Sequence, residues 1–127
     1  MAFAWGADAV YAGADRYSLR ARAENFPDGV LQASIEQARV MGKPLYLAVN
    51  AFFDDELLEG LADFLLGLGV PGPSALIMSD PGAMAVACRV RPDLPIHVST
   101  QANTMNAEAV RVWRDRFGAR RVVLARE

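Results

Sequence analysis

The sequence predicts an α/β protein in which parallel βα repeats follow one another around a sheet. Five short apolar runs, each closed by polar residues, recur along the chain and cover positions 8–13, 44–50, 75–80, 95–100 and 121–127. A helical pattern separates each run from the next, which is typical of strands joined by crossover helices. The runs are rich in Val, Ile and Leu, and this composition predicts a sheet that is covered on both faces.

Helices are expected between the runs, and capping residues mark their ends. The first is predicted to begin at Asp28 and to end before Gly42, because glycine favours the position after a helix. The second is predicted over residues 54–68, where one helical face carries leucines at positions 57, 58, 61, 65 and 68. Each leucine that packs against the sheet is expected to contribute about 1.5–3 kcal/mol before conformational entropy is counted.

Two further helices complete the pattern. Asp80 can cap the third helix, and Pro81 fits its first helical position. Asn106 is predicted to cap the fourth helix, which ends before Gly118. Its core-facing residues are expected to be Val110, Trp113 and Phe117.

Length and composition limit the classes of protein to consider. The 127 residues suffice for one domain, and the formal net charge of -2 excludes a global basic field, although a local basic patch remains compatible with it. A single cysteine, Cys88, excludes an internal disulfide and a cysteine-based metal cluster, so we expect a small buried apolar residue there. No segment approaches the roughly 20 apolar residues of a transmembrane helix, so no membrane partner is expected.

Two architectures fit five βα units. A complete (β/α)₈ barrel needs about 250 residues, roughly twice this length. The alternative is an open doubly wound sheet, which usually carries a glycine-rich loop after its first strand, yet Gly13 is not followed by the G-x-G-x-x-G spacing. Periodicity alone leaves both architectures open.

Polar residues follow the strands at the edge where parallel strands end, and we call this set the rim. Its members at or just past strand ends are Asn50, Asp80, Ser99, Gln101, Asn103, Arg126 and Glu127. Carboxylates, amides and a guanidinium suit a small polar ligand or the edge of a nucleobase. Simpler roles are a helix cap for Asp80, a turn for Asn50 and a surface ion pair between the last two residues.

His97 and Ser99 lie two apart on one strand and therefore share a face. At about 7 Å along the strand, their separation exceeds direct hydrogen-bonding reach, which argues against a hydrolytic dyad. His97 is instead predicted to be an interior polar or ligand-binding group. With one histidine and no paired cysteines, the sequence gives no support for a zinc site or any other metal site.

A basic segment follows the first strand. Arg20 and Arg22 lie there among Tyr17 and Phe26, a mixture that suits a phosphate and a stacked base. The alternative is a solvated loop whose arginines lie along the surface.

Several segments together resemble peptidase family U32, the collagenase-like unassigned peptidases. They are residues 6–13, 16–26, 79–82, 96–103 and 121–127, in the same order as in the family. Residues 2–5 and 16–20 are most similar to the branch that hydroxylates the wobble uridine of transfer RNA. The resemblance implies a barrel-type catalytic domain acting on tRNA, or alternatively a collagenase-like hydrolase.

The resemblance also implies site residues and cofactors. It points to Asp80, His97, Ser99, Gln101, Asn103 and Glu127 as candidate catalytic residues, and to Arg20, Arg22, Asn25 and Arg126 as candidate substrate-binding residues. Asn50 joins the substrate-binding candidates because of its place in the rim. An iron–sulfur cluster and prephenate are implied for longer family members. Family members carry a strand and helix before Gly6 and a cysteine-rich signature after Glu127.

We therefore expect residues 1–127 to form a single partial barrel domain, cut at both ends, that holds no cluster itself. A cut barrel leaves two edge strands, and we expect self-association or pairing with missing polypeptide. The isolated chain is expected to be inactive, and the longer protein to be a cytoplasmic RNA hydroxylase or peptidase.

Overall fold

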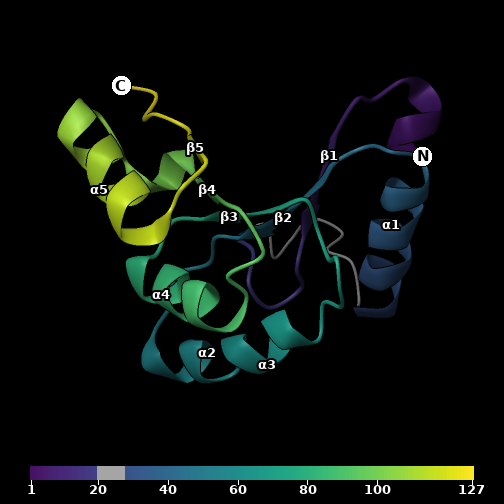
Figure 1. The fold of residues 1–127 in the computed structure, drawn as a ribbon, viewed down its shortest axis with the longest axis horizontal. Coiled ribbons are helices and arrows are strands. Elements are labelled where there is room, and N and C mark those ends of the chain that lie inside the picture. Colours follow the sequence, from purple (N-terminus) through teal and green to yellow (C-terminus); the bar gives the residue numbers. More distant parts are fainter. Residues whose placement is uncertain (20–27) are drawn as a thin grey trace.

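A computed structural model describes residues 1–19 and 28–127 of the chain (Figure 1). Five parallel strands form one sheet, and each pairs with the strands next to it in sequence, in the order β1-β2-β3-β4-β5. The strands are β1 (Val10–Gly13), β2 (Leu45–Val49), β3 (Ala75–Met78), β4 (Ile96–Val98) and β5 (Arg121–Val122). The predicted parallel βα architecture is confirmed.

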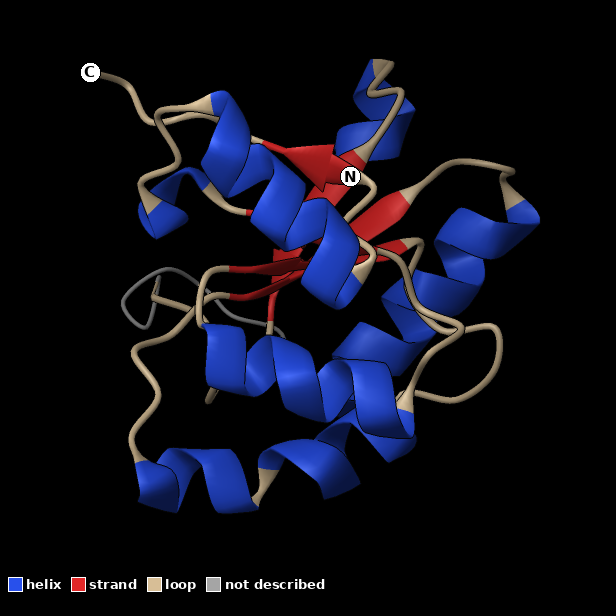
Figure 2. Cartoon of the chain, turned by 60° about the vertical axis from the view of Figure 1, so that its left-hand side comes forward, coloured by secondary structure: helices blue, strands red, loops and turns tan. Residues whose placement is uncertain are grey.

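Helices alternate with these strands (Figure 2). The α-helices are α1 (Asp28–Val40), α2 (Asp55–Glu59), α3 (Leu61–Leu66), α4 (Pro81–Val90) and α5 (Ala107–Phe117). Two short 3₁₀ helices, η1 and η2, cover Ala2–Trp5 and Thr100–Ala102. None of the helices in the described ranges is long and apolar enough to span a bilayer.

The strand order decides between the two architectures that the sequence left open. A doubly wound sheet reverses its strand order part-way, which sends helices to both faces. Here the order never reverses, and because crossovers are right-handed, successive helices pass over the same face. Figure 1 shows the helices wrapped around one side of a curved sheet. This arrangement is that of part of a TIM-type barrel.

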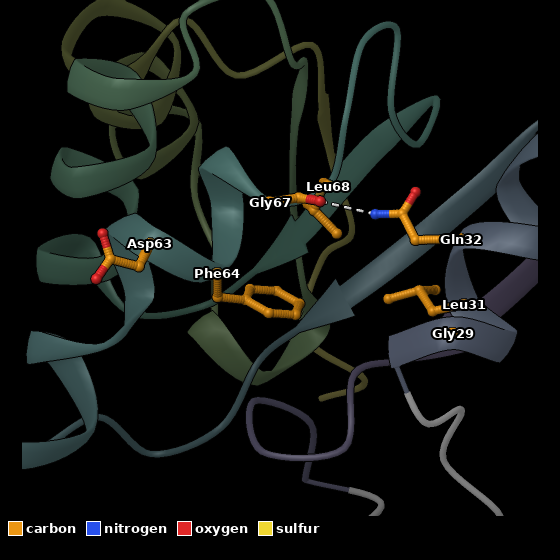
Figure 3. Close-up of a pocket in the computed structure, with 7 residues that line it drawn as sticks. All are labelled: Gly29, Leu31, Gln32, Asp63, Phe64, Gly67 and Leu68. Atoms are coloured by element: carbon orange, nitrogen blue, oxygen red, sulfur yellow. Dashed lines mark hydrogen bonds between the residues drawn. The ribbon is translucent and has the colours of Figure 1, made fainter.

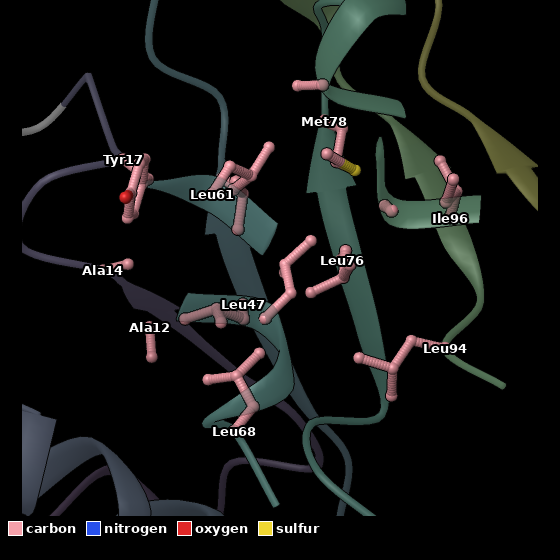
Figure 4. Close-up of a cluster of buried hydrophobic side chains, with 14 of the residues drawn as sticks. Ala12, Ala14, Tyr17, Leu47, Leu61, Leu68, Leu76, Met78, Leu94 and Ile96 are labelled. Carbon is pink, nitrogen blue, oxygen red and sulfur yellow. The ribbon is translucent and has the colours of Figure 1, made fainter. Parts of the chain in front are cut away.

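Burial alternates along β2, which corrects, for that strand, the expectation that both sheet faces would be covered, although Ala75 of β3 and His97 of β4 are buried on the same face as Tyr46. Along β2, Leu45, Leu47 and Val49 are buried, whereas Tyr46 and Ala48 alternate with them and are only partly buried. The buried set faces the helices and joins the main apolar cluster (Figure 4). The near-continuous apolar sequence is explained by the curved sheet, whose other face is the interior side of a barrel wall.

The helix predicted over residues 54–68 is interrupted at Gly60, which separates α2 from α3. A Cβ at Gly60 would lie 2.9 Å from Tyr17 Oη. The Tyr17 ring is buried; it stacks on Phe53 at a centroid distance of 5.9 Å and packs at a tilt against Phe64 at 4.7 Å. The glycine therefore lets the aromatic side chain approach the helix backbone closely, a contact that periodicity does not reveal.

The last two strands are shorter than predicted. β4 ends at Val98 rather than continuing to residue 100, and the chain turns into η2, which contains Gln101. β5 ends at Val122 rather than continuing to residue 127. The backbone after β5 is still held, because Val123 N donates to Val98 O at 2.9 Å.

The fourth predicted helix corresponds to α5, which begins after its cap Asn106 and ends before Gly118. Trp113 and Phe117 are partly buried against the core, whereas α5 contains no fully buried residue. Trp113 Nε1 donates to Thr104 Oγ1 at 2.9 Å and so fixes the helix to the segment before it.

We expect the chain to self-associate for two reasons. β1 and β5 are free edges of the described sheet, and Tyr11 is 70% exposed on the sheet face opposite the helices, which we call the open face. Sedimentation equilibrium should show concentration-dependent association. Tyr11→Lys should weaken it, whereas Val40→Lys, an equally exposed site at the end of α1, should not. A sharp monomer that binds no hydrophobic dye would contradict the expectation.

Candidate functional site

The Asn50 carboxamide joins the carboxyl ends of three strands. Leu19 N, in the segment after β1, donates to Asn50 Oδ1 at 3.3 Å. Asn50 Nδ2 in turn donates at 2.8 Å to Oε1 of Gln101, which follows β4. Because Asn50 itself follows β2, residues distant in sequence meet at one edge, as the rim hypothesis requires.

The loop after β4 is fixed by its own polar groups. Ser99 Oγ accepts a hydrogen bond from Gln101 N at 3.3 Å and so caps η2. Thr100 Oγ1 donates to Leu124 O at 3.0 Å, which ties this loop to the chain after β5. Asn103 ends η2 in a left-handed conformation with φ 54°, which asparagine adopts more readily than most residues. These contacts hold the Gln101 backbone in place.

Asp80 lies at the end of β3 and caps α4. Its Oδ2 accepts a hydrogen bond from Ala83 N at 2.7 Å, and Pro81 occupies the first turn. The capping role that the sequence offered for Asp80 is therefore present in the structure.

Arg126 and Glu127 are both exposed at the end of the chain. No ion pair joins them among the described residues, so the surface pair suggested as an alternative is absent there. Arg20, Arg22 and Asn25 lie outside the described residues.

His97 is 9% exposed and lies on the sheet face opposite the helices, next to Arg121 in register. Its ring centroid is 5.1 Å from that of Tyr46. Burial and the nearby Arg121 charge together lower the pKa of His97, so the imidazole is neutral near pH 7. Within residues 1–19 and 28–127, no hydrogen bond joins His97 to Ser99, in agreement with the argument against a dyad.

Residues 1–127 match the family model described as Peptidase family U32. The chain belongs to peptidase family U32. It is 44% identical over 126 residues to a tRNA hydroxylation protein P of Escherichia coli and 38% identical over 123 residues to tRNA hydroxylation protein P1 of Bacillus subtilis. It is also 40% identical over 123 residues to a protein named collagenase from Porphyromonas gingivalis. No solved structure gives a significant match.

These alignments cover nearly all of this U32 chain but only part of its relatives. The matched share is 99% of this chain and 28% of the E. coli protein, 97% and 29% for the B. subtilis protein, and 96% and 29% for the P. gingivalis protein. The chain therefore spans under a third of the length of these relatives.

The described residues of this U32 chain do not fit an iron–sulfur cluster. Such clusters need several thiolate ligands, and the sequence has one cysteine. Cys88 is partly buried in α4, where Sγ lies 3.5 Å from Phe117 O as a hydrogen-bond donor and burial raises the pKa of the thiol. No group of three His, Cys, Asp or Glu side chains that could hold a metal occurs in the described part of the chain.

A cavity of about 340 Å³ lies between α1 and α3, and none of the rim residues lines it (Figure 3). Gln32 Nε2 donates to Gly67 O at 2.8 Å across it, and Leu31, Phe64 and Leu68 line it. Asp63 is the one charged residue among those lining it, so this part of the helix layer offers little polar chemistry.

Tyr46 and Arg121 are the residues near His97 that sequence reasoning missed. The alternation of side chains along the apolar runs could have identified Tyr46, because its side chain faces the opposite side of the sheet from its buried neighbours Leu45 and Leu47. The pairing of β4 with β5, which places Arg121 beside His97, is not readable from either strand alone.

Proposed function

We propose that this protein takes part in tRNA hydroxylation and that the rim binds the uridine to be modified. Relatives named tRNA hydroxylation proteins in three bacterial species support the tRNA part of this proposal. The observation that carries the uridine part is the Asn50–Gln101 carboxamide pair, held at the junction of three strand ends.

The proposal follows from the hydrogen-bonding capacity of a carboxamide. A uracil edge presents one N–H donor beside carbonyl acceptors, and a carboxamide presents an acceptor beside N–H donors, so the two can pair bidentately. Gln101 Oε1 accepts one bond from Asn50 and retains a second lone pair, while its Nε2 group is an additional donor. Because Asn50 and the η2 backbone fix this group, it is already oriented for a base.

We expect Gln101→Ala to lower the yield of hydroxylated uridine about tenfold or more, because one bidentate base contact contributes about 1–3 kcal/mol. The measurement is mass spectrometry of tRNA nucleosides, in cells whose only copy of the full protein carries the variant. Gln37→Ala, an exposed glutamine on α1, is the matched control and should leave the yield unchanged. An unchanged yield in Gln101→Ala at equal protein abundance would remove this residue from the site.

The basic segment after β1 is proposed to bind the RNA backbone. We expect Arg20→Ala combined with Arg22→Ala to weaken tRNA binding and to flatten its salt dependence, because each lost phosphate contact lowers the log–log slope by roughly 0.7–0.9. Binding is measured between low and moderate salt. Arg116→Ala, on the exposed side of α5, is the control. A slope that stays the same would show that the segment does not contact phosphate.

The relative named collagenase supplies a second candidate activity, cleavage of a protein substrate. The geometry gives it less support, because Ser99 Oγ is used to cap η2 and His97 forms no hydrogen bond with it among the described residues. Protease-free protein that cleaves gelatin and loses this activity in Ser99→Ala would reverse the order of the two candidates.

A further inference from the structure

Four side chains from four strands gather on the open face of the sheet, and we call them the open-face cluster: Tyr11, Tyr46, His97 and Arg121. The Tyr46 ring is central. Its centroid lies 5.7 Å from that of Tyr11 and 5.1 Å from that of His97, and the Arg121 guanidinium carbon lies 5.6 Å from it. The cluster lies below the rim, because His97 is on β4 and comes two residues before Ser99, which follows that strand.

Two of these groups have unmet hydrogen-bonding capacity. His97 is 9% exposed, yet no hydrogen bond to its imidazole occurs among the described residues. Buried polar side chains normally have a partner, so this one calls for an explanation. Arg121 is exposed on β5 and forms no ion pair within residues 1–19 and 28–127, so its guanidinium remains available to an anion.

The positions of these two groups favour a shared ligand. A guanidinium stacked on an aromatic ring keeps the N–H groups along its edge available for an oxyanion. His97 is the register partner of Arg121, so its ring nitrogens lie on the same face of the neighbouring strand. We propose that the open-face cluster binds a small molecule through a carboxylate or phosphate group, held by Arg121 and His97 beside the Tyr46 ring.

The charges that face the cluster are few. β1 and β2 contribute Tyr11 and Tyr46, and β3 contributes Ala75 and Ile77, which carry no charge. Arg121 from β5 is thus the one permanently charged side chain that the described strands place beside His97. A bound oxyanion would offset this positive charge and favour the imidazolium, so anion affinity should increase as the pH falls through the pKa of His97.

The single histidine makes a direct test possible, because the imidazole gives one set of NMR signals. The pKa of His97 is measured in the 127-residue chain with chloride, acetate or inorganic phosphate at equal ionic strength. We expect acetate, phosphate or both to raise this pKa relative to chloride, saturably. A response to acetate alone identifies a carboxylate ligand, and a response to phosphate alone identifies a phosphate ligand.

Matched arginine variants separate specific binding from screening. Arg121→Gln should raise the pKa of His97 in chloride, because a repelling charge is removed, and should weaken anion binding about tenfold or more. Arg120→Gln, on the preceding residue and outside the register of His97, should behave as the unchanged protein does. Equal anion responses in both variants, or no response in the unchanged chain, would overturn the proposal. Since no RNA is present, neither result depends on the proposed tRNA function.

Discussion

Tyr17→Ala is expected to lower the free energy of unfolding by about 3–5 kcal/mol, the range for removing a large aromatic side chain from a core. The Tyr17 side chain is fully buried, and its ring packs against Phe53 and Phe64. Its carbonyl also accepts a hydrogen bond from Ala51 N at 2.9 Å, next to Asn50. The cavity left by the substitution would therefore loosen the helix layer and the support of the rim together.

Urea unfolding monitored by circular dichroism measures this effect, at a concentration where the chain is monomeric. Tyr11→Ala is the matched control, because its ring is 70% exposed and little buried area is lost. Tyr17→Phe keeps the ring in place and should remain within about 1 kcal/mol of the unchanged protein. If Tyr17→Ala were no more destabilising than Tyr11→Ala, the assigned packing of Tyr17 would be wrong.

Arg91→Met is expected to lower the free energy of unfolding by about 2–4 kcal/mol, because it leaves two carbonyl groups without their donor. Arg91 is 5% exposed and donates to Leu65 O at 2.8 Å and to Gly69 O at 2.9 Å. Its guanidinium also forms a bidentate pair with the carboxylate of Asp93, both bonds being 2.9 Å long. One side chain therefore connects the end of α3, the turn after it and the segment before β4.

Arg89→Met is the control for Arg91→Met, since Arg89 lies exposed in α4, two residues before Arg91 at the end of that helix, and should change stability by no more than about 0.5 kcal/mol. Acid titration adds a second measurement. The hydrogen bond from Arg91 lowers the pKa of Asp93, so the stabilisation is present above the usual aspartate pKa and is lost as the pH falls below about 4. Arg91→Met should lose this part of the pH dependence, and similar acid sensitivity in both proteins would contradict the role of the pair.

The elements that local sequence marks were predictable. Asp80 followed by Pro81 marks the start of α4, and Asn106 marks the start of α5, because capping depends on one residue and its next turn. It was also predictable that polar residues after different strands would meet at one edge of the sheet, as the hydrogen bond between Asn50 and Gln101 shows. Predicting these features requires only the identity of neighbouring residues and the assumption that the strands are parallel.

Features that depend on tertiary register were not predictable. Nothing around Arg91 in the sequence indicates that its guanidinium is buried, because its carbonyl partners lie on another helix and a turn. The interruption at Gly60 depends on where Tyr17 packs, more than forty residues earlier. The association of His97 with Arg121 similarly requires knowledge of which residues are opposite each other in β4 and β5.

The pairing of every strand with its sequence neighbours also bears on how the chain folds during synthesis. Within the described sheet, each strand after β1 finds its first partner one βα unit earlier in the sequence. Such short-range topology lowers contact order and favours rapid folding. β1, β2 and β3 can therefore assemble as they leave the ribosome, with β4 and β5 added onto an existing template.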